Sequence, residues 1–215
     1  QLTQREMDLA ASIQKVTEYV VIKLARGIAK ETGERNICLA GGVALNCVVN
    51  GIILREKIFD NIWIQPAAGD AGGALGAALS VWYLDNQRER KITSVSDAMK
   101  GSYLGPAFSD SEIERELKAS GAVFKKCSEN ELIEEVTSAL VNEKVIGWMQ
   151  GRMEFGPRAL GGRSIIADPR SHKMQKQLNL KVKYRESFRP FAPSVLCDDV
   201  GDWFEHYSDS PYMLL

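Results

Sequence analysis

The chain has 215 residues, of which 45% are hydrophobic and 26% charged, and its formal net charge at pH 7 is −1. These values are typical of a globular protein, and no apolar run is long and uncharged enough to predict a membrane-spanning helix. The four cysteines form no CxxC pair, which argues against a zinc site or a disulfide framework and fits a reducing, cytoplasmic location.

The first part of the sequence predicts an α/β unit. Short apolar runs at 36–40 and 62–64 predict buried parallel strands, and helices are expected over 4–33, about 44–57 and about 70–84. The first helix has apolar residues close to the 3.6-residue period: Ile13, Val16, Val20, Leu24 and Ile28.

The second part predicts another α/β unit after a charged linker at 86–106. Two capping boxes predict helix starts: Ser109 with Glu112, and Ser128 with Glu131. Strand candidates follow at 145–149, 164–167 and 191–196, the last interrupted by Pro193. We therefore expect two domains, residues 1–95 and 96–215.

Glycines at the end of the first predicted strand form the first candidate site. In open α/β sheets, ligands bind where the parallel strands end, because backbone N–H groups point into the crevice there. Gly41 and Gly42 would let a base or a phosphate approach the main chain, and Asn46 offers both a donor and an acceptor. A strand-to-helix turn without a ligand also explains a lone Gly-Gly pair.

The turn after the second strand is more specific. Asp70 stands among Gly69, Gly72 and Gly73, so few side chains compete for the space around its carboxylate. Such a carboxylate can cap the helix or bind a metal that bridges nucleotide phosphates. Capping needs only the aspartate, so the glycines favour the metal interpretation.

A basic segment spans residues 151–193, with ten Lys/Arg against three Asp/Glu. Arg152 and Arg158 lie in a stretch rich in Gly and Pro, and Lys183 and Arg189 follow. Guanidinium groups matched with glycine N–H groups suit phosphate oxygens, which predicts a cleft for a small phosphorylated substrate.

Aromatic residues in the same segment leave an alternative open. Cations interleaved with Tyr184, Phe188 and Phe191 could stack on RNA and follow its backbone. The Gly-Pro-Arg and Phe-Arg-Pro-Phe sequences stiffen the loop and favour the cleft, so a nucleic-acid partner is disfavoured.

Four stretches together resemble one family, the nodulation-type O-carbamoyltransferases. They are Gly41–Asn46, Gln65–Gly76, Gly151–Gly161 and Lys183–Val195. The resemblance implies that residues 1–95 are the C-terminal half of an actin/Hsp70-like domain, similar to the universal tRNA threonylcarbamoyl transferase subunit. It implies that residues 96–215 are a truncated YrdC-like α/β domain.

The resemblance also implies an ATP-dependent reaction, in which carbamoyl adenylate is made from carbamoyl phosphate and ATP. The carbamoyl group would then pass to a hydroxyl of a sugar or natural product. Arg158, Lys183 and Arg189 match cations that grip the substrate phosphates, and Arg152 would assist. Asp70 matches a carboxylate ligand of iron or another divalent metal, whose histidine ligands belong to the other half of the actin-like domain.

Partners follow from the same resemblance. An actin-like domain closes around its nucleotide between two halves, so we expect a longer chain that supplies the N-terminal half, and an inactive protein without it. A small-molecule acceptor is expected, a homodimer is an option, and no membrane is implied. Two other functions stay open: an RNA-associated protein of the threonylcarbamoyl pathway and a nucleotide-binding module without chemistry.

Overall fold

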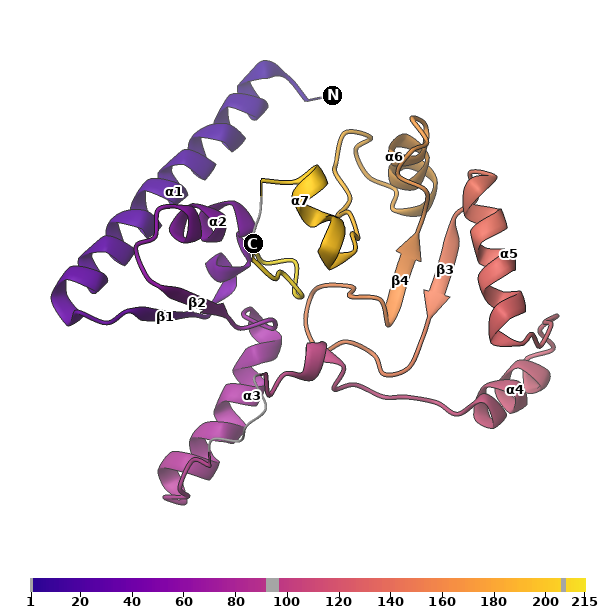
Figure 1. Cartoon of the computed structure of the whole chain (residues 1–215), viewed down its shortest axis with the longest axis horizontal. Helices are drawn as coiled ribbons and strands as arrows, with labels where there is room; N and C mark the ends of the chain where they lie inside the picture. Colours follow the sequence, from indigo (N-terminus) through magenta and orange to yellow (C-terminus); the bar gives the residue numbers. More distant parts are fainter. Residues whose placement is uncertain (1, 92–96, 206–207) are drawn as a thin grey trace. The chain divides into compact units, whose positions relative to one another are not determined.

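The computed structural model of the chain is a mixed α/β structure, as predicted (Figure 1). The residues it describes are 2–91, 97–205 and 208–215, so the domain boundary expected between residues 95 and 96 lies outside them. No helix in these ranges is both long enough and apolar enough to cross a membrane.

The chain divides into two compact units. The first comprises Gln1–Ser102, Phe155–Arg158 and Ser210–Leu215. The second comprises Tyr103–Glu154 and Ala159–Asp209. Residues 155–158, which lie between the two segments of the second unit, and residues 210–215, which follow it, thus belong to the first unit.

The first unit starts with the predicted long helix. Helix α1, Gln4–Thr32, begins with a capping box between Thr3 and Glu6 and ends at Gly33, whose φ is 70°. Such a left-handed residue ends a helix at little cost when it is glycine.

The two predicted parallel strands of this unit are present, but the expected burial is wrong, since Ile64 is the one buried residue in them. Strand β1, Asn36–Leu39, pairs in parallel with strand β2, Asn61–Ile64, and Leu39 lies opposite Ile64. Each strand leads through a turn into a helix: α2, Cys47–Arg55, follows a 3₁₀ turn at Gly42–Leu45, and α3, Asp70–Ser80, runs on into a π-helical turn at Val81–Asp85.

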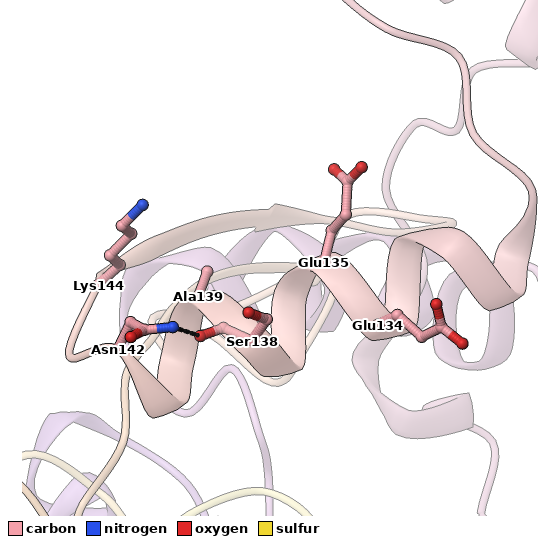
Figure 2. Close-up of a pocket in the computed structure, with 6 residues that line it drawn as sticks. All are labelled: Glu134, Glu135, Ser138, Ala139, Asn142 and Lys144. Atoms are coloured by element: carbon pink, nitrogen blue, oxygen red, sulfur yellow. Dashed lines mark hydrogen bonds between the residues drawn. The ribbon is translucent and has the colours of Figure 1, made fainter.

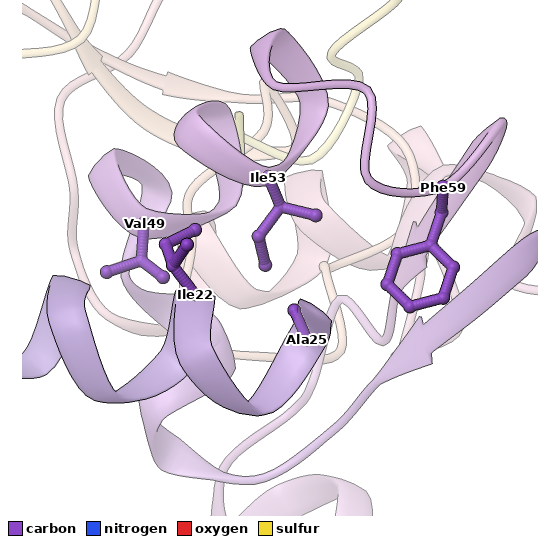
Figure 3. Packing of buried hydrophobic residues seen from close by; sticks show 5 residues of the cluster. All are labelled: Ile22, Ala25, Val49, Ile53 and Phe59. Atoms are coloured by element: carbon purple, nitrogen blue, oxygen red, sulfur yellow. The ribbon is translucent and has the colours of Figure 1, made fainter. Parts of the chain in front are cut away.

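The core of the first unit lies between α1, α2 and the segment before β2 (Figure 3). Its buried members are Ile22, Ala25, Val49, Ile53 and Phe59. Val49 and Ile53 of α2 are each 1% exposed, so α2 is held mainly by burial of its apolar side chains.

The apolar stripe predicted along α1 is not its buried side. Ile13, Val16 and Leu24 are 65%, 55% and 60% exposed, and Val20 and Ile28 are also exposed. Burial on α1 is instead centred on Ile22 and Ala25, because α2 packs against that side.

The second unit contains the two predicted capped helices, α4, Asp110–Ala119, and α5, Glu129–Val141. Both capping boxes are present, since Ser109 pairs with Glu112 and Ser128 with Glu131. Helix α5 packs against β3, Ile146–Met149, which pairs antiparallel with β4, Arg163–Ile166.

The third strand candidate of this unit is wrong. Residues 191–196 adopt no regular structure, and Pro193 has no N–H to donate to a sheet ladder. Before this segment, α6, Met174–Gln177, continues into a π-helical turn at Leu178–Val182; after it, a 3₁₀ turn at Cys197–Asp199 leads into α7, Val200–Trp203.

Candidate functional site

The two glycine turns of the first unit are adjacent. Gly41, directly after β1, has a φ of 97°, a value that glycine adopts readily and other residues rarely do. Its N–H donates to the carbonyl of Ala68, 2.8 Å away, which ties the turn after β1 to the turn after β2. The carboxyl ends of both strands therefore meet at one edge of the small sheet.

The glycines of these turns serve different purposes. A Cβ on Gly72 would overlap the carbonyl oxygen of Ala67, so packing alone requires glycine there. A Cβ on Gly69 would make an ordinary contact with Leu45, at 3.7 Å. A Cβ on Gly42 or Gly73 would meet nothing within 4 Å. Gly41 also has open space, but its φ already favours glycine. At Gly42 and Gly73, neither packing nor a positive φ explains the glycine.

The amide of Asn46 is engaged in the fold. Its Oδ1 accepts the N–H of Val49 at 3.2 Å and thereby caps α2. Its Nδ2 donates to Oε1 of Gln14 in α1, at 2.9 Å. These two bonds join α1 to α2 and account for the asparagine without a ligand.

Asp70 does not cap its helix by a hydrogen bond. It is the first residue of α3, the capping position belongs to Gly69, and no side-chain cap bond is formed. Its side chain is exposed, at the end of the helix that favours negative charge. No three His, Cys, Asp or Glu residues gather within 2–91, 97–205 and 208–215, so this part of the chain offers one free carboxylate rather than a complete metal site.

Arg158 lies with the glycine turns in the first unit. Its Nη2 donates to the carbonyl of Leu45 at 3.2 Å, and its Nε is buried and has no partner among the described residues. The backbone at Gly156 is close to the turn after β2, since a Cβ there would be 3.2 Å from the carbonyl oxygen of Pro66. The sequence grouped Arg158 with Lys183 and Arg189, whereas the structure places those two in the second unit.

A buried carboxylate organises the part of the basic segment that lies in the second unit at 151–154 and 159–163, called the basic loop below. The sequence analysis did not identify this carboxylate. Glu154 is 8% exposed, and its Oε1 accepts the N–H groups of Leu160, Gly162 and Arg163 at 2.8, 2.6 and 3.1 Å. Burial would raise the pKa of Glu154, but backbone N–H groups, including its own, outweigh burial and lower the pKa below its usual value. The sequence signal that could have identified Glu154 was a single acid within a basic, glycine-rich stretch.

The backbone N–H groups of residues 160–163 are therefore all engaged within the loop. Besides those bound to Glu154, the N–H of Gly161 donates to the hydroxyl of Ser164 at 3.0 Å. The guanidinium of Arg163 donates to the carbonyls of Gln150, Gly151 and Gly162. The N–H groups of Gly161 and Gly162 are thus not free to hold phosphate oxygens. For Gly151, whose N–H has no acceptor among the described residues, phosphate binding stays a prediction.

A depression of about 380 Å³ opens beside this loop. It is lined by Tyr103, Gln150, Gly151, Arg152, Gly161 and Gly162. Arg152 donates to the carbonyl of Gly105 at 2.9 Å and is otherwise exposed. Lys183 and Arg189 do not line this depression, so Arg152 is the cation that it shares with the predicted phosphate-binding set.

A larger depression, of about 460 Å³, lies on α5 and offers no anion site (Figure 2). Its lining includes two carboxylates, Glu134 and Glu135, and one cation, Lys144. Glu135 already pairs with Lys125. The net negative lining would repel a phosphorylated substrate.

Lys183 and Arg189 lie on one exposed turn of the second unit. Lys183 follows the π-helical turn, and its ammonium group has no partner within the described part of the chain. The guanidinium of Arg189 lies 3.8 Å from the carboxylate of Glu186, and its side chain is 52% exposed. Both side chains are therefore accessible to an anion.

Comparisons with known proteins place both ends of the chain in one family. The family model described as carbamoyltransferase N-terminus matches residues 1–79, and the one described as carbamoyltransferase C-terminus matches residues 137–215.

Similar proteins extend over nearly the whole chain. Uncharacterized protein sll1178 of Synechocystis sp. is 63% identical over 100% of this chain and 35% of its own length. Nodulation protein NolO of Bradyrhizobium diazoefficiens is 43% identical over 94% of this chain and 36% of its own length. Nodulation protein U of the same organism is 34% identical over 98% of this chain and 35% of its own length. The chain thus spans about a third of the length of these curated relatives.

Proposed function

Because the chain belongs to the carbamoyltransferase family, we propose that it is part of an ATP-dependent O-carbamoyltransferase. One observation supports the proposal most directly. Arg158 and Lys183 lie in the region matched by the C-terminus model, and the described residues leave the buried Nε of Arg158 and the exposed ammonium of Lys183 without a partner. Unpaired cations of this kind suit phosphate oxygens.

The proposed reaction has two steps. Carbamoyl phosphate, ATP and water give carbamoyl adenylate, phosphate and pyrophosphate; an acceptor hydroxyl then takes the carbamoyl group and releases AMP. Arg158, Lys183 and Arg189 would hold phosphate oxygens and offset the charge that develops on them, with Arg152 assisting. Gly42, whose surroundings are open, would allow the nucleotide to approach the main chain.

The domain assignment is part of the same proposal. The first unit would be the C-terminal half of an actin/Hsp70-like domain, with Gly41, Gly69, Gly72 and Gly73 forming the nucleotide-binding edge. The second unit would belong to a YrdC-like domain. The adjacency of the two glycine turns in the first unit supports the nucleotide-binding part.

A metal would be shared with residues outside this chain. Asp70 would supply one oxygen ligand to iron or another divalent ion, which fits a free carboxylate. Because the described residues hold no further ligands near enough to form a cluster, no step is assigned to a metal here. When bound, the ion would supply Lewis-acid chemistry.

The remaining partners are proposed from the family alone. The acceptor would be a small molecule with a free hydroxyl, such as a sugar or a natural product, and the reaction would take place in the cytoplasm. The rest of the complete protein would close the nucleotide site, and a homodimer is compatible with these roles.

The proposal is tested with the complete protein, carbamoyl phosphate and ATP, by following pyrophosphate release. We expect release in the wild type and loss of it in Arg158→Ala and Lys183→Ala, while Asp70→Ala should keep release and block transfer to an acceptor. Lys176→Ala is a matched control, since Lys176 is an exposed lysine of α6 in the same unit. Wild-type release rates in both the Arg158 and the Lys183 variants would refute the assignment.

Two exposed aromatic side chains support RNA binding as an alternative function. Tyr184 and Phe188, next to the cations, are 85% and 64% exposed, and exposed aromatic rings can stack on bases. Titration with tRNA and with carbamoyl phosphate separates the two functions. Binding of tRNA without binding of carbamoyl phosphate would favour the RNA-associated function.

A further inference from the structure

We propose that Asn179 is a positioning residue, which holds the turn 183–189 in the shape that presents Arg189 to a substrate phosphate. The inference rests on the proposed function of Arg189 as a phosphate-binding cation. Asn179 lies on the π-helical turn, before the stretch Lys183–Val195 that resembles the family, so the resemblance assigns it no role.

The side-chain amide of Asn179 is buried and fully bonded. The residue is 0% exposed. Its Nδ2 donates to the carbonyls of Ser187 and Arg189 at 3.2 and 2.8 Å, and its Oδ1 accepts from Nε of Arg185 at 2.6 Å. One amide has two N–H donors and one carbonyl oxygen, so every polar atom of this side chain is spent on the turn.

A second amide secures the same stretch of backbone. Nε2 of Gln175, in α6, donates to the carbonyls of Phe188 and Arg189 at 3.1 and 3.2 Å. The carbonyl of Arg189 therefore accepts from two side chains, Asn179 and Gln175. The backbone at Arg189 is anchored, while its side chain remains half-exposed with only a 3.8 Å ion pair to Glu186.

Arg185 belongs to this support rather than to the substrate-binding cations. Its Nε is bound to Asn179, its backbone N–H donates to the carbonyl of Asn179 at 2.9 Å, and its guanidinium lies 4.9 Å from the centre of the Phe191 ring. The turn thus divides its cations into one that braces it, Arg185, and two that face outward, Lys183 and Arg189.

Fixing the backbone in advance matters because a displaced cation loses most of its effect on a reacting phosphate. A shift of about 1 Å in a positioning group can cost on the order of 100-fold in rate. Asparagine is the residue required here, because aspartate of the same shape would lose both donors and place a carboxylate against two carbonyl oxygens.

The test compares pyrophosphate release by the complete protein and its Asn179→Asp variant. We expect kcat/KM for carbamoyl phosphate to fall about 10- to 100-fold. The Gln175→Glu variant, altered at an exposed position, should fall in the same direction by less. Gln177→Glu is the control, an amide-to-acid change on the same helix at a side chain without a hydrogen bond to the turn.

A double-mutant cycle distinguishes positioning from general damage. If Asn179 acts through Arg189, Asn179→Asp should change kcat/KM little once Arg189→Ala is present. A fall of the same size in both backgrounds, or wild-type kinetics in Asn179→Asp and Gln175→Glu, would overturn the inference.

A second readout does not depend on the reaction. In the ligand-free protein, trypsin should cut after Lys183 and Arg185 faster in Asn179→Asp than in the wild type or in Gln177→Glu, because the turn has lost its anchor. An unchanged cutting rate would count against Asn179. If the wild type releases no pyrophosphate, the proposed function fails, and the cutting rate still decides whether Asn179 holds the turn.

Discussion

The carboxylate of Glu154 fills the position that an anionic ligand would take if the N–H groups of Leu160, Gly162 and Arg163 were free. It is buried, and three backbone N–H groups point at one of its oxygens. The loop is therefore ordered by an anion that the protein carries itself. Gly162 allows this arrangement, because a Cβ there would be 3.1 Å from Cδ of Glu154 and 2.6 Å from the carbonyl oxygen of Arg152.

Replacing this charge should loosen the loop. Glu154→Gln keeps the shape but turns charge-assisted bonds into neutral ones, so we expect the free energy of unfolding at pH 7 to fall by about 1–2 kcal/mol. Because the folded state lowers the pKa of Glu154, its contribution is present above pH 4.5 and is lost as the pH falls below that value. Denaturant unfolding at pH 7 and pH 4 measures both effects; an equal deficit at the two pH values would contradict the charge argument.

Tyr212 is a second residue whose ionisation is coupled to folding. Burial raises the pKa of Tyr212 to about 12, assisted by its hydrogen bond to the carboxylate of Asp97. The folded state thus favours the neutral phenol, whose contribution is complete below pH 10 and is lost as the pH rises toward 12. Between pH 9 and 11, unfolding free energy should fall more steeply in the wild type than in Tyr212→Phe; equal slopes would contradict the prediction.

At the scale of elements, helix α3 shows how adjacent glycines can differ. Gly72 packs against the carbonyl of Ala67 at the end of the turn, whereas Gly73 has open space around its Cα. Both lie in the first turn of a helix of 11 residues. The fold thus requires glycine at position 72, whereas the space beside Gly73 is open to a ligand.

This difference predicts opposite outcomes for two neighbouring substitutions. Gly72→Ala should lower the thermal midpoint, because the clash is with backbone, while Gly73→Ala should keep it or raise it, since alanine favours a helix by up to about 1 kcal/mol. If the nucleotide approaches α3 here, Gly73→Ala should weaken ATP binding about tenfold, measured by titration of the complete protein. A stable Gly73→Ala protein with unchanged ATP affinity would remove Gly73 from the nucleotide site.

At the scale of the whole molecule, the two units bury apolar side chains unequally. The first unit contains the core around Val49 and Ile53. Among the described residues of the second unit, only Met174 and Leu178 are buried apolar side chains, and α4 and α5 contain no buried residue. Burial is the main favourable contribution to folding, so the units should differ in local stability.

Hydrogen exchange on the isolated chain tests this difference. The N–H groups of α2 should exchange at least about 100-fold more slowly than those of α4 and α5, because opening α2 exposes core residues. The part of α1 before Ile22 is a control region, because it also lacks buried side chains and should exchange about as fast as α4 and α5. Equal protection in α2 and α5 would show that features other than apolar burial stabilise the second unit.

Local signals in the sequence determined where most elements begin and end. The stop of α1 at Gly33, the strands β1 and β2, and the capping boxes at Ser109 and Ser128 were all predicted and are all present. Each depends on hydrogen bonds within a few residues or on a short apolar run, so the residues that decide it are neighbours in the sequence. The family resemblance likewise depended on contiguous motifs.

Only the tertiary structure decided which residues far apart in the sequence meet. It covered α1 at Ile22 and Ala25 instead of the predicted stripe, left 191–196 unpaired, and placed Arg158 beside Leu45. It also used the N–H groups of Leu160, Gly162 and Arg163 to bind Glu154. The physical reason is that burial and hydrogen-bond satisfaction depend on what packs against a group, and that partner can lie more than a hundred residues away, as Leu45 does from Arg158.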